Sequence, residues 1–103
     1  MKDNLQLLSN LDRILHEPAR LMIVSILELI EAGDFVFLLK QTELTAGNLS
    51  THLSKLDEVG YIKIEKKFKG KMPLTLCKLT SKGQKALTIY RTQLREFLSK
   101  SPE

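Results

Sequence analysis

Cysteine and histidine are scarce in this chain of 103 residues. Cys77 is the single cysteine, which excludes an internal disulfide and a thiol-rich metal site. The two histidines, His16 and His52, do not stand at metal-ligand spacing from each other or from the cysteine. We therefore predict neither a metal centre nor another cofactor.

Long apolar runs, repeats and linkers are also missing. No apolar segment approaches the length that crosses a bilayer, and MKDNLQLLSN lacks the basic start and apolar core of a signal peptide. No Pro/Gly/Ser-rich linker or internal repeat divides the chain, so we predict one domain over residues 1–103, with a modest core. Together with the lone thiol, these absences favour a cytoplasmic protein that does not associate with membranes.

No catalytic arrangement is visible in the sequence. Asp57 and Glu58 are adjacent, but on a helix their side chains diverge by about 100° and cannot act as a pair. Ser50 and His52 also point to different sides of a helix, which leaves no nucleophile beside a base. We predict that the protein is not an enzyme.

Charge is distributed unevenly along the chain. Residues 1–60 contain five Lys or Arg against nine Asp or Glu, whereas residues 61–103 contain eleven against three. Five of the lysines lie within residues 61–73. Such segregation predicts a positive face and a polyanion or an acidic surface as partner. A solvated hairpin that is kept soluble by its lysines would explain the charge distribution equally well.

Apolar spacing predicts helices in the first half of the chain. Leucines at spacings of three and four indicate a helix over about residues 3–15. Glu17-Pro18 interrupts it, and a second helix should run from Pro18 to about Ala32, where Gly33 is placed to end it. Residues 35–42 form a short apolar segment that we expect to be helical.

The second half changes from helical to strand periodicity and back. Thr45 is the expected N-cap of a helix over about residues 45–59, which ends before Gly60. Residues 61–68 and 75–79 alternate as two strands joined by KGKMP, in which Gly70 permits a positive φ. Thr80 should cap a last helix over about residues 81–99. The predicted fold is mainly α with a small β-hairpin.

The helix over residues 45–59 has an unusual exposed face. Leu49, Leu53 and Leu56 form its buried stripe, and the opposite side is small and polar. Gly, Asn, Ser and Thr have low helix propensities, so this face lowers the stability of the helix. The choice of these residues therefore indicates a role other than stability. Small hydrogen-bonding side chains allow a helix to enter the DNA major groove. The lysine-rich hairpin that follows would then hold the neighbouring phosphates by displacing counterions.

Here the chain resembles a known family. The segment LTAGNLSTHLSKLDEVGYI, the basic hairpin KKFKGKMP and the helix LTSKGQKAL are similar to the winged helix-turn-helix regulators of the MarR and ArsR type, over about residues 11–95. The resemblance implies a transcription factor that binds double-stranded DNA, usually as a homodimer on a near-palindromic operator. Its recognition helix would be residues 45–59 and its wing residues 61–79. The sequence identifies no effector.

Candidate DNA-binding residues follow from the exposed face and from the resemblance. They are Thr45, Gly47, Asn48, Ser50, Thr51, Ser54 and Lys55 in the helix, and Lys66, Lys67, Lys69 and Lys71 in the wing.

The terminal helices, over about residues 3–15 and 81–99, each have an apolar stripe that we predict to form a dimer interface. The stripes are Leu5, Leu8, Leu11 and Leu15, and Leu87, Tyr90, Leu94, Phe97 and Leu98. The alternative is that the last helix packs over the first within one chain.

Two other functions remain open from the sequence. A winged helix can serve as a protein–protein adaptor, with the basic hairpin against an acidic partner, but an adaptor would more often expose apolar anchors on the helix face. RNA binding usually requires exposed aromatic residues, for which only Phe68 and Tyr61 are available. DNA binding is the preferred interpretation.

Overall fold

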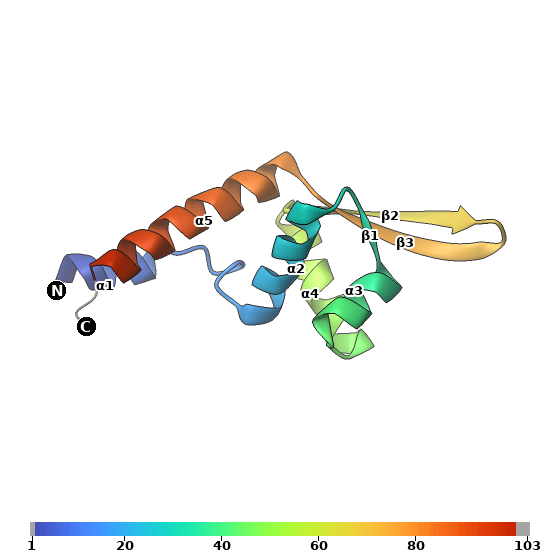
Figure 1. The fold of residues 1–103 in the computed structure, drawn as a ribbon, viewed down its shortest axis with the longest axis horizontal. Coiled ribbons are helices and arrows are strands. Elements are labelled where there is room, and N and C mark those ends of the chain that lie inside the picture. The colour runs from blue at the N-terminus through green and yellow to red at the C-terminus, as the bar shows by residue number, and fades with distance from the viewer. Residues whose placement is uncertain (1, 101–103) are drawn as a thin grey trace.

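The computed structural model describes residues 2–100, which form five helices and a small antiparallel sheet (Figure 1). The helices are α1 (Lys2–Ser9), α2 (Pro18–Leu29), α3 (Phe35–Thr42), α4 (Ala46–Glu58) and α5 (Ser81–Ser99). The strands are β1 (Gly33–Asp34), β2 (Ile62–Lys69) and β3 (Met72–Leu79), in the order β1-β3-β2. The predicted fold class, mainly α with a β-hairpin, is confirmed, and β1 is an addition to it.

Side-chain caps fix where the later helices begin. Thr45 Oγ1 accepts a hydrogen bond from the N–H group of Asn48 at 3.2 Å, and Thr80 Oγ1 accepts one from Gly83 at 3.0 Å. Both caps were predicted and are confirmed. Asp34 caps α3 in the same way, through the N–H group of Phe37 at 2.8 Å. Each cap pairs an N–H group that has no partner within its helix.

The first helix is shorter than the predicted span of residues 3–15. It ends at Ser9, and the carboxylate of Asp12 accepts hydrogen bonds from the N–H groups of Ile14 and Leu15 at 2.8 and 3.1 Å. An aspartate that binds nearby backbone amides competes with the helical hydrogen-bond pattern. Residues 10–17 therefore form a turned connection, which we call the α1–α2 loop.

The predicted end of the second helix was also wrong. Helix α2 stops at Leu29, and Ile30 is extended, with φ −131° and ψ 156°. Gly33 does not end the helix but pairs with Cys77 as the first residue of β1. A Cβ atom at this position would lie 3.1 Å from Ile30 Cδ1, so the glycine allows β1 to pack closely on α2.

The hairpin is longer and tighter than predicted. Its strands extend to Lys69 and from Met72, which are cross-strand partners, so the turn is only Gly70 and Lys71 rather than KGKMP. Gly70 has φ +64°, the conformation that a two-residue hairpin turn requires. We refer to β2, β3 and this turn as the wing.

The hydrophobic core lies where α2, α3, α4, the base of the wing and the start of α5 meet. Leu15, Ile23, Leu38 and Leu56 are among its fully buried members. Leu11, Leu15, Leu87 and Tyr90 were predicted to line a dimer interface, but they are buried in this core. That part of the prediction was wrong, because the α1–α2 loop turns back toward the body instead of continuing the first helix.

The molecule is elongated, with projections at both ends (Figure 1). The C-terminal half of α5 extends from one end with α1 beside it, and the wing extends from the other end. The dimensions are 58 × 26 × 21 Å, and the radius of gyration is 15.6 Å, against about 13 Å for a compact domain of this length. Helices α1 and α5 pack against each other within one chain, and the dimer stays a prediction.

Candidate nucleic-acid interface

Helix α4 turns its leucines inward and its small polar residues outward. Leu49, Leu53 and Leu56 are buried in the core. The seven candidate residues are all exposed: Thr45, Gly47, Asn48, Ser50, Thr51, Ser54 and Lys55. A Cβ atom on Gly47 would meet nothing within 4 Å, so this part of the helix presents bare backbone to solvent. The exposed face is therefore slim enough for close approach to another surface.

The polar groups of this face are not equally available. The hydroxyl of Thr45 accepts the Asn48 N–H group as the helix cap, and the hydroxyl of Thr51 donates to the carbonyl of Gly47 at 3.0 Å. Within residues 2–100, the side chains of Asn48, Ser50 and Ser54 make no hydrogen bond to the protein. These three side chains have their full hydrogen-bonding capacity for a ligand, whereas Thr51 would contribute an acceptor and its methyl group.

Strand alternation divides the wing lysines between two faces. Ile62 and Ile64 pair with Leu79 and Cys77 on the face that packs against the helical body, and Lys66 continues that face toward the tip. The opposite face has Lys67 beside Leu74 and Lys69 beside Met72, and Lys71 lies in the turn. All four lysines are exposed, as expected, but they do not point in one direction.

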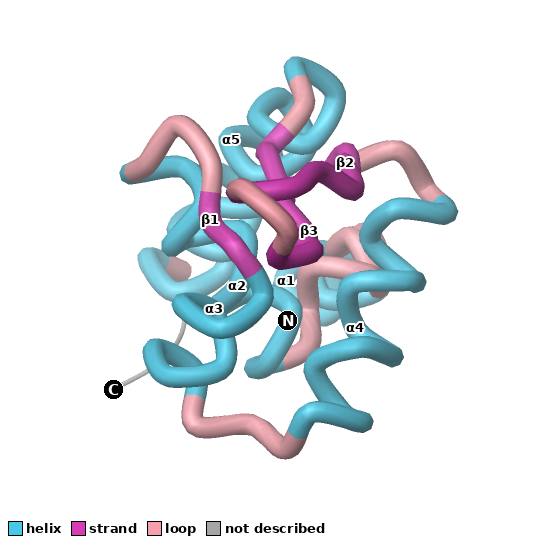
Figure 2. The backbone as a smooth tube through the Cα atoms, turned by 90° about the vertical axis from the view of Figure 1, so that its right-hand side faces the viewer, coloured by secondary structure: helices cyan, strands magenta, loops and turns pink. Residues whose placement is uncertain are grey.

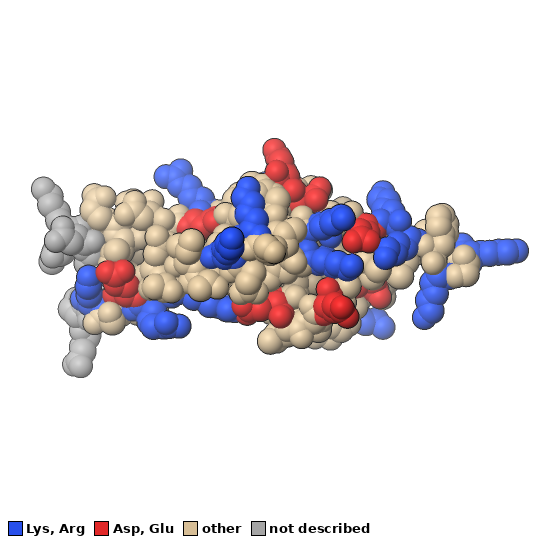
Figure 3. Space-filling view, turned by 90° about the horizontal axis from the view of Figure 1, so that it is seen from above, with Lys and Arg blue, Asp and Glu red and all other residues tan. Residues whose placement is uncertain are grey.

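The same lysines differ in their ion pairs. Lys67 Nζ lies 3.3 Å from Glu65 Oε2, and Lys78 lies 3.6 Å from the other oxygen of that carboxylate. A hydrogen bond from Lys67 and the charges of both lysines hold the pKa of Glu65 below its usual value. Lys66, Lys69 and Lys71 form no ion pair with any described residue. They leave the wing tip with uncompensated positive charge, visible at the wing end in Figure 3.

Comparison with known proteins agrees with this geometry. A family model described as "Winged helix DNA-binding domain" matches residues 19–98. The chain belongs to the winged-helix DNA-binding domain family. The winged-helix chain is also 35% identical over 92 residues to the uncharacterized protein MJ0432 of Methanocaldococcus jannaschii, covering 88% of this chain and 98% of that protein.

Solved structures share the winged-helix fold. A transcriptional regulator homologue from Pyrococcus horikoshii OT3 has a TM-score of 0.84 and 25% identity, with 96% of each chain covered. NadR in complex with 4-hydroxyphenylacetate has a TM-score of 0.66 and 20% identity, covering 95% of this chain and 72% of that one. The resemblance to winged helix-turn-helix regulators is confirmed, and the chain is a winged-helix DNA-binding domain rather than an enzyme.

A buried arginine connects the winged-helix core to the exposed helix. Arg20 Nε donates to the carbonyl of Ile14 at 2.7 Å, and its Nη1 lies 3.1 Å from Nδ1 of His52 in α4. Glu17 caps α2 through the N–H groups of Ala19 and Arg20, and it lies 3.6 Å from the same His52 nitrogen. These polar contacts link His52 in α4 to the N-terminal end of α2.

The charge of Glu17 is stabilised in this cluster. Burial opposes ionisation, but the two backbone N–H groups and the nearby His52 and Arg20 outweigh it and lower the pKa of Glu17. Sequence reasoning missed the roles of Glu17 and Arg20. The only local signal was Glu17-Pro18, which marks a helix start, whereas nothing in the pattern distinguishes a buried arginine from an exposed one.

A second side-chain bridge joins the α1–α2 loop to the base of the wing. The hydroxyl of Tyr61 donates a hydrogen bond to Oδ2 of Asp12, the residue that also closes the loop. Burial, the hydrogen bond and the charge of Asp12 raise the pKa of Tyr61 to about 12. The ammonium group of Lys82 lies 5.9 Å from the centre of the Tyr61 ring. The start of the wing is thereby fixed to elements on both sides of it.

Two other residues with reactive side chains, Cys77 and His16, contact the protein itself. Cys77 is buried in β3, and burial together with the charge of Asp57 raises its thiol pKa to about 11, away from the reactive thiolate form. His16 Nδ1 lies 2.9 Å from the Tyr90 hydroxyl.

Residues 2–100 contain no group of three or more His, Cys, Asp or Glu placed to hold a metal ion. No helix in the described part of the chain is long and apolar enough to cross a membrane.

Proposed function

We propose that this winged-helix domain binds a near-palindromic operator in double-stranded DNA as a homodimer and regulates transcription there. In this proposal α4 enters the major groove and the wing contacts phosphates beside it. The observation that supports it best is the exposed, small-residue face of α4 next to wing lysines without ion pairs. A helix that must only be soluble has no need for bare backbone and free amide and hydroxyl groups on its outer face.

The contacts with bases would come from α4. Asn48 can form two hydrogen bonds with adenine, and Ser50 and Ser54 can bind bases or phosphate oxygens. Gly47 permits the backbone to approach the DNA, and Lys55 would approach a phosphate near the end of the helix. Thr51 would make an apolar contact through its methyl group, since its hydroxyl already donates to Gly47.

Affinity independent of sequence would come chiefly from the wing. Lys66 and Lys71 have no ion pair to break, so their contacts with phosphate would release counterions without loss of a protein contact. Lys67 is already paired with Glu65 and should contribute less. Lys69 strengthens the positive potential of the tip.

Dimerisation would use the terminal helices. Although α1 packs on α5, Leu5, Leu8 and Leu98 remain exposed, and Leu94 and Phe97 are only partly buried. These residues lie at the end that projects beyond the helical body (Figure 1). Joining two chains there would cover apolar surface and hold two α4 helices about 34 Å apart, one turn of DNA.

The proposal is tested first by selection of genomic fragments with the purified protein, followed by anisotropy titrations over a range of salt concentrations. We expect a two-fold symmetric consensus. The variant Lys66→Ala/Lys71→Ala should weaken binding to selected and random DNA alike and lower the slope of log K against log salt by about one per lost contact. Lys67→Ala is the matched control and should change both quantities less.

Asn48→Ala separates base recognition from general affinity. It should reduce binding to the selected site by about 1–3 kcal/mol and relax the preference at one position, while random DNA is bound as before. Selection without any consensus, together with an unchanged salt slope in the double lysine variant, would reject the proposed interface.

A further inference from the structure

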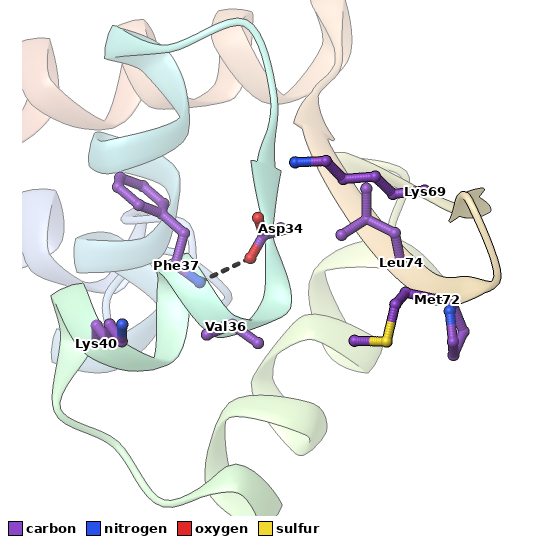
Figure 4. Close-up of a pocket in the computed structure, with 8 residues that line it drawn as sticks. Asp34, Val36, Phe37, Lys40, Lys69, Met72 and Leu74 are labelled. Carbon is purple, nitrogen blue, oxygen red and sulfur yellow. Dashed lines mark hydrogen bonds between the residues drawn. The ribbon is translucent and has the colours of Figure 1, made fainter.

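A second surface of the wing faces α3 rather than α4. A groove of about 420 Å³ lies between the start of α3 and the wing, and we call it the α3–wing groove (Figure 4). Its main lining residues are Val36, Phe37, Lys40, Lys69, Met72 and Leu74. None of them belongs to the exposed face of α4, so DNA recognition by that helix leaves the groove unexplained.

The groove exposes large apolar side chains from two separate elements. Val36 in α3 is 59% exposed and Met72 in β3 is 71% exposed, whereas the ring of Phe37 points away from the wing (Figure 4). In Figure 4, Val36 and Met72 face one another across the opening. Apolar side chains that gather at a concave surface mark a site of interaction more often than isolated exposed ones do.

Positive charge borders this apolar surface. Lys40 lies on the α3 side and Lys69 on the wing side, and neither forms an ion pair with another described residue. Asp34 is the one acidic residue in the lining, and its carboxylate already accepts the N–H group of Phe37 as the α3 cap. The groove therefore complements a ligand that combines apolar side chains with negative charge.

The position of the groove permits binding beside DNA. Viewed down the wing, α3 lies at the β1 side of the sheet and α4 on the other side, next to β2 (Figure 2). Strand alternation places Lys69, Met72 and Leu74 on the opposite wing face from Lys66. A ligand in the groove would contact α3 and this wing face, whereas DNA would lie against α4 and Lys66.

The groove favours contacts through side chains rather than through an added strand. β1 pairs only with Leu76 and Cys77, so the outer half of β3 has no strand neighbour on that side. Pro73 lies in this unpaired part of β3 and has no N–H group to donate, which disfavours pairing with an added strand.

We propose that the α3–wing groove binds an acidic, amphipathic segment of a partner protein, whose apolar side chains insert between Val36 and Met72 while its carboxylates meet Lys40 and Lys69. This would give the DNA-bound domain a separate contact with a second protein. The proposal does not depend on the dimer or on the operator, and its basis is the charge and apolar character of the groove itself.

The test is selection of short random peptides from a displayed library on the wild-type protein, with counter-selection on Val36→Ser/Met72→Ser. Both substituted side chains are exposed, so the fold should be kept. We expect the enriched peptides to share large apolar residues and a net negative charge. Affinity of the most enriched peptide should fall at least about tenfold in the double variant and in Lys40→Glu. Leu29→Ser, which changes an 83% exposed leucine outside the groove, should have no effect.

Three results would overturn the proposal. Peptides that bind the double variant equally well, or that are enriched for basic or purely polar residues, would show that the groove does not select this chemistry. Loss of DNA affinity in Val36→Ser/Met72→Ser would assign the groove to the DNA interface. A smaller mass of that variant in light scattering would assign it to contact between two copies of the chain. Failure of DNA binding in the wild-type protein would instead concern the proposed operator function, because peptide selection needs no DNA.

Discussion

At the scale of single residues, Gly47 and Gly83 lie in opposite environments although both are helical. A Cβ atom on Gly83 would lie 2.1 Å from the carbonyl oxygen of Tyr61, where backbone meets backbone at the base of the wing. Thr80 reinforces that junction, because its hydroxyl lies 2.6 Å from the carbonyl oxygen of Gly60 and caps α5 as well. Gly47 has open space around it. Packing therefore requires a glycine at position 83 but not at position 47.

We expect Gly83→Ala to destabilise the protein by about 1–3 kcal/mol, since the backbone of Tyr61 cannot move aside without shifting the wing. Gly47→Ala should raise stability by up to about 1 kcal/mol, the helix-propensity difference between the two residues. Urea unfolding of both variants measures these changes. If Gly83→Ala unfolds at the wild-type urea concentration, the close approach of α5 to Tyr61 is not present in solution.

At the scale of elements, Arg20 links α4 to the α1–α2 loop. It bridges the carbonyl of Ile14 in the α1–α2 loop to His52 in α4, two described segments with no backbone hydrogen bond between them. Because Arg20 itself is buried, we expect any effect of this residue on DNA binding to be exerted through His52 and α4.

Replacement of Arg20 by Met keeps much of the side-chain volume but removes both hydrogen bonds. We expect a loss of about 1–3 kcal/mol in unfolding free energy, because the Ile14 carbonyl and His52 lose their partner. Affinity for the selected operator should also fall, measured by anisotropy at a temperature where the variant is fully folded. Arg13→Met is the control, since Arg13 is exposed, and it should keep its stability. Unchanged operator affinity in folded Arg20→Met would limit the arginine to a structural role.

The other elements show where sequence patterns were sufficient. Helix α3 was predicted at residues 35–42 and is observed there, and α4 and α5 begin at the predicted caps Thr45 and Thr80. Apolar periodicity and capping depend on residues a few positions apart, which a sequence displays directly. The end of α1 and the role of Gly33 were missed, because Asp12 and β1 act through turns and pairing that periodicity does not register.

At the scale of the whole molecule, α1 and the C-terminal half of α5 project from the helical body at the end opposite the wing (Figure 1). Leu98 is 61% exposed at that end. This projection and that of the wing at the opposite end together give the long axis of 58 Å (Figure 1).

Light scattering tests the proposed dimer. We expect a mass of twice 11.7 kDa for the wild-type protein. Leu98→Glu should reduce it to that of one chain, because a charge would be buried without a partner in the interface. Leu29→Glu introduces the same charge at an exposed leucine outside the terminal helices and should leave the dimer intact. A wild-type mass of 11.7 kDa at micromolar concentration would refute the dimer.

The sequence by itself determined the helix periods, the caps, the small polar face of α4 and the concentration of lysine in the wing. These properties arise from neighbouring residues and survive in any fold that keeps the local structure. The tertiary structure alone decided which leucines became core, which wing lysines point toward α3, and which polar side chains support α4. Asp12 and Tyr61 are 49 positions apart, and Arg20 and His52 are 32 apart. Contacts over such separations form only in the folded chain. There, burial of the hydrophobic core offsets the entropy that is lost when two distant residues are brought together.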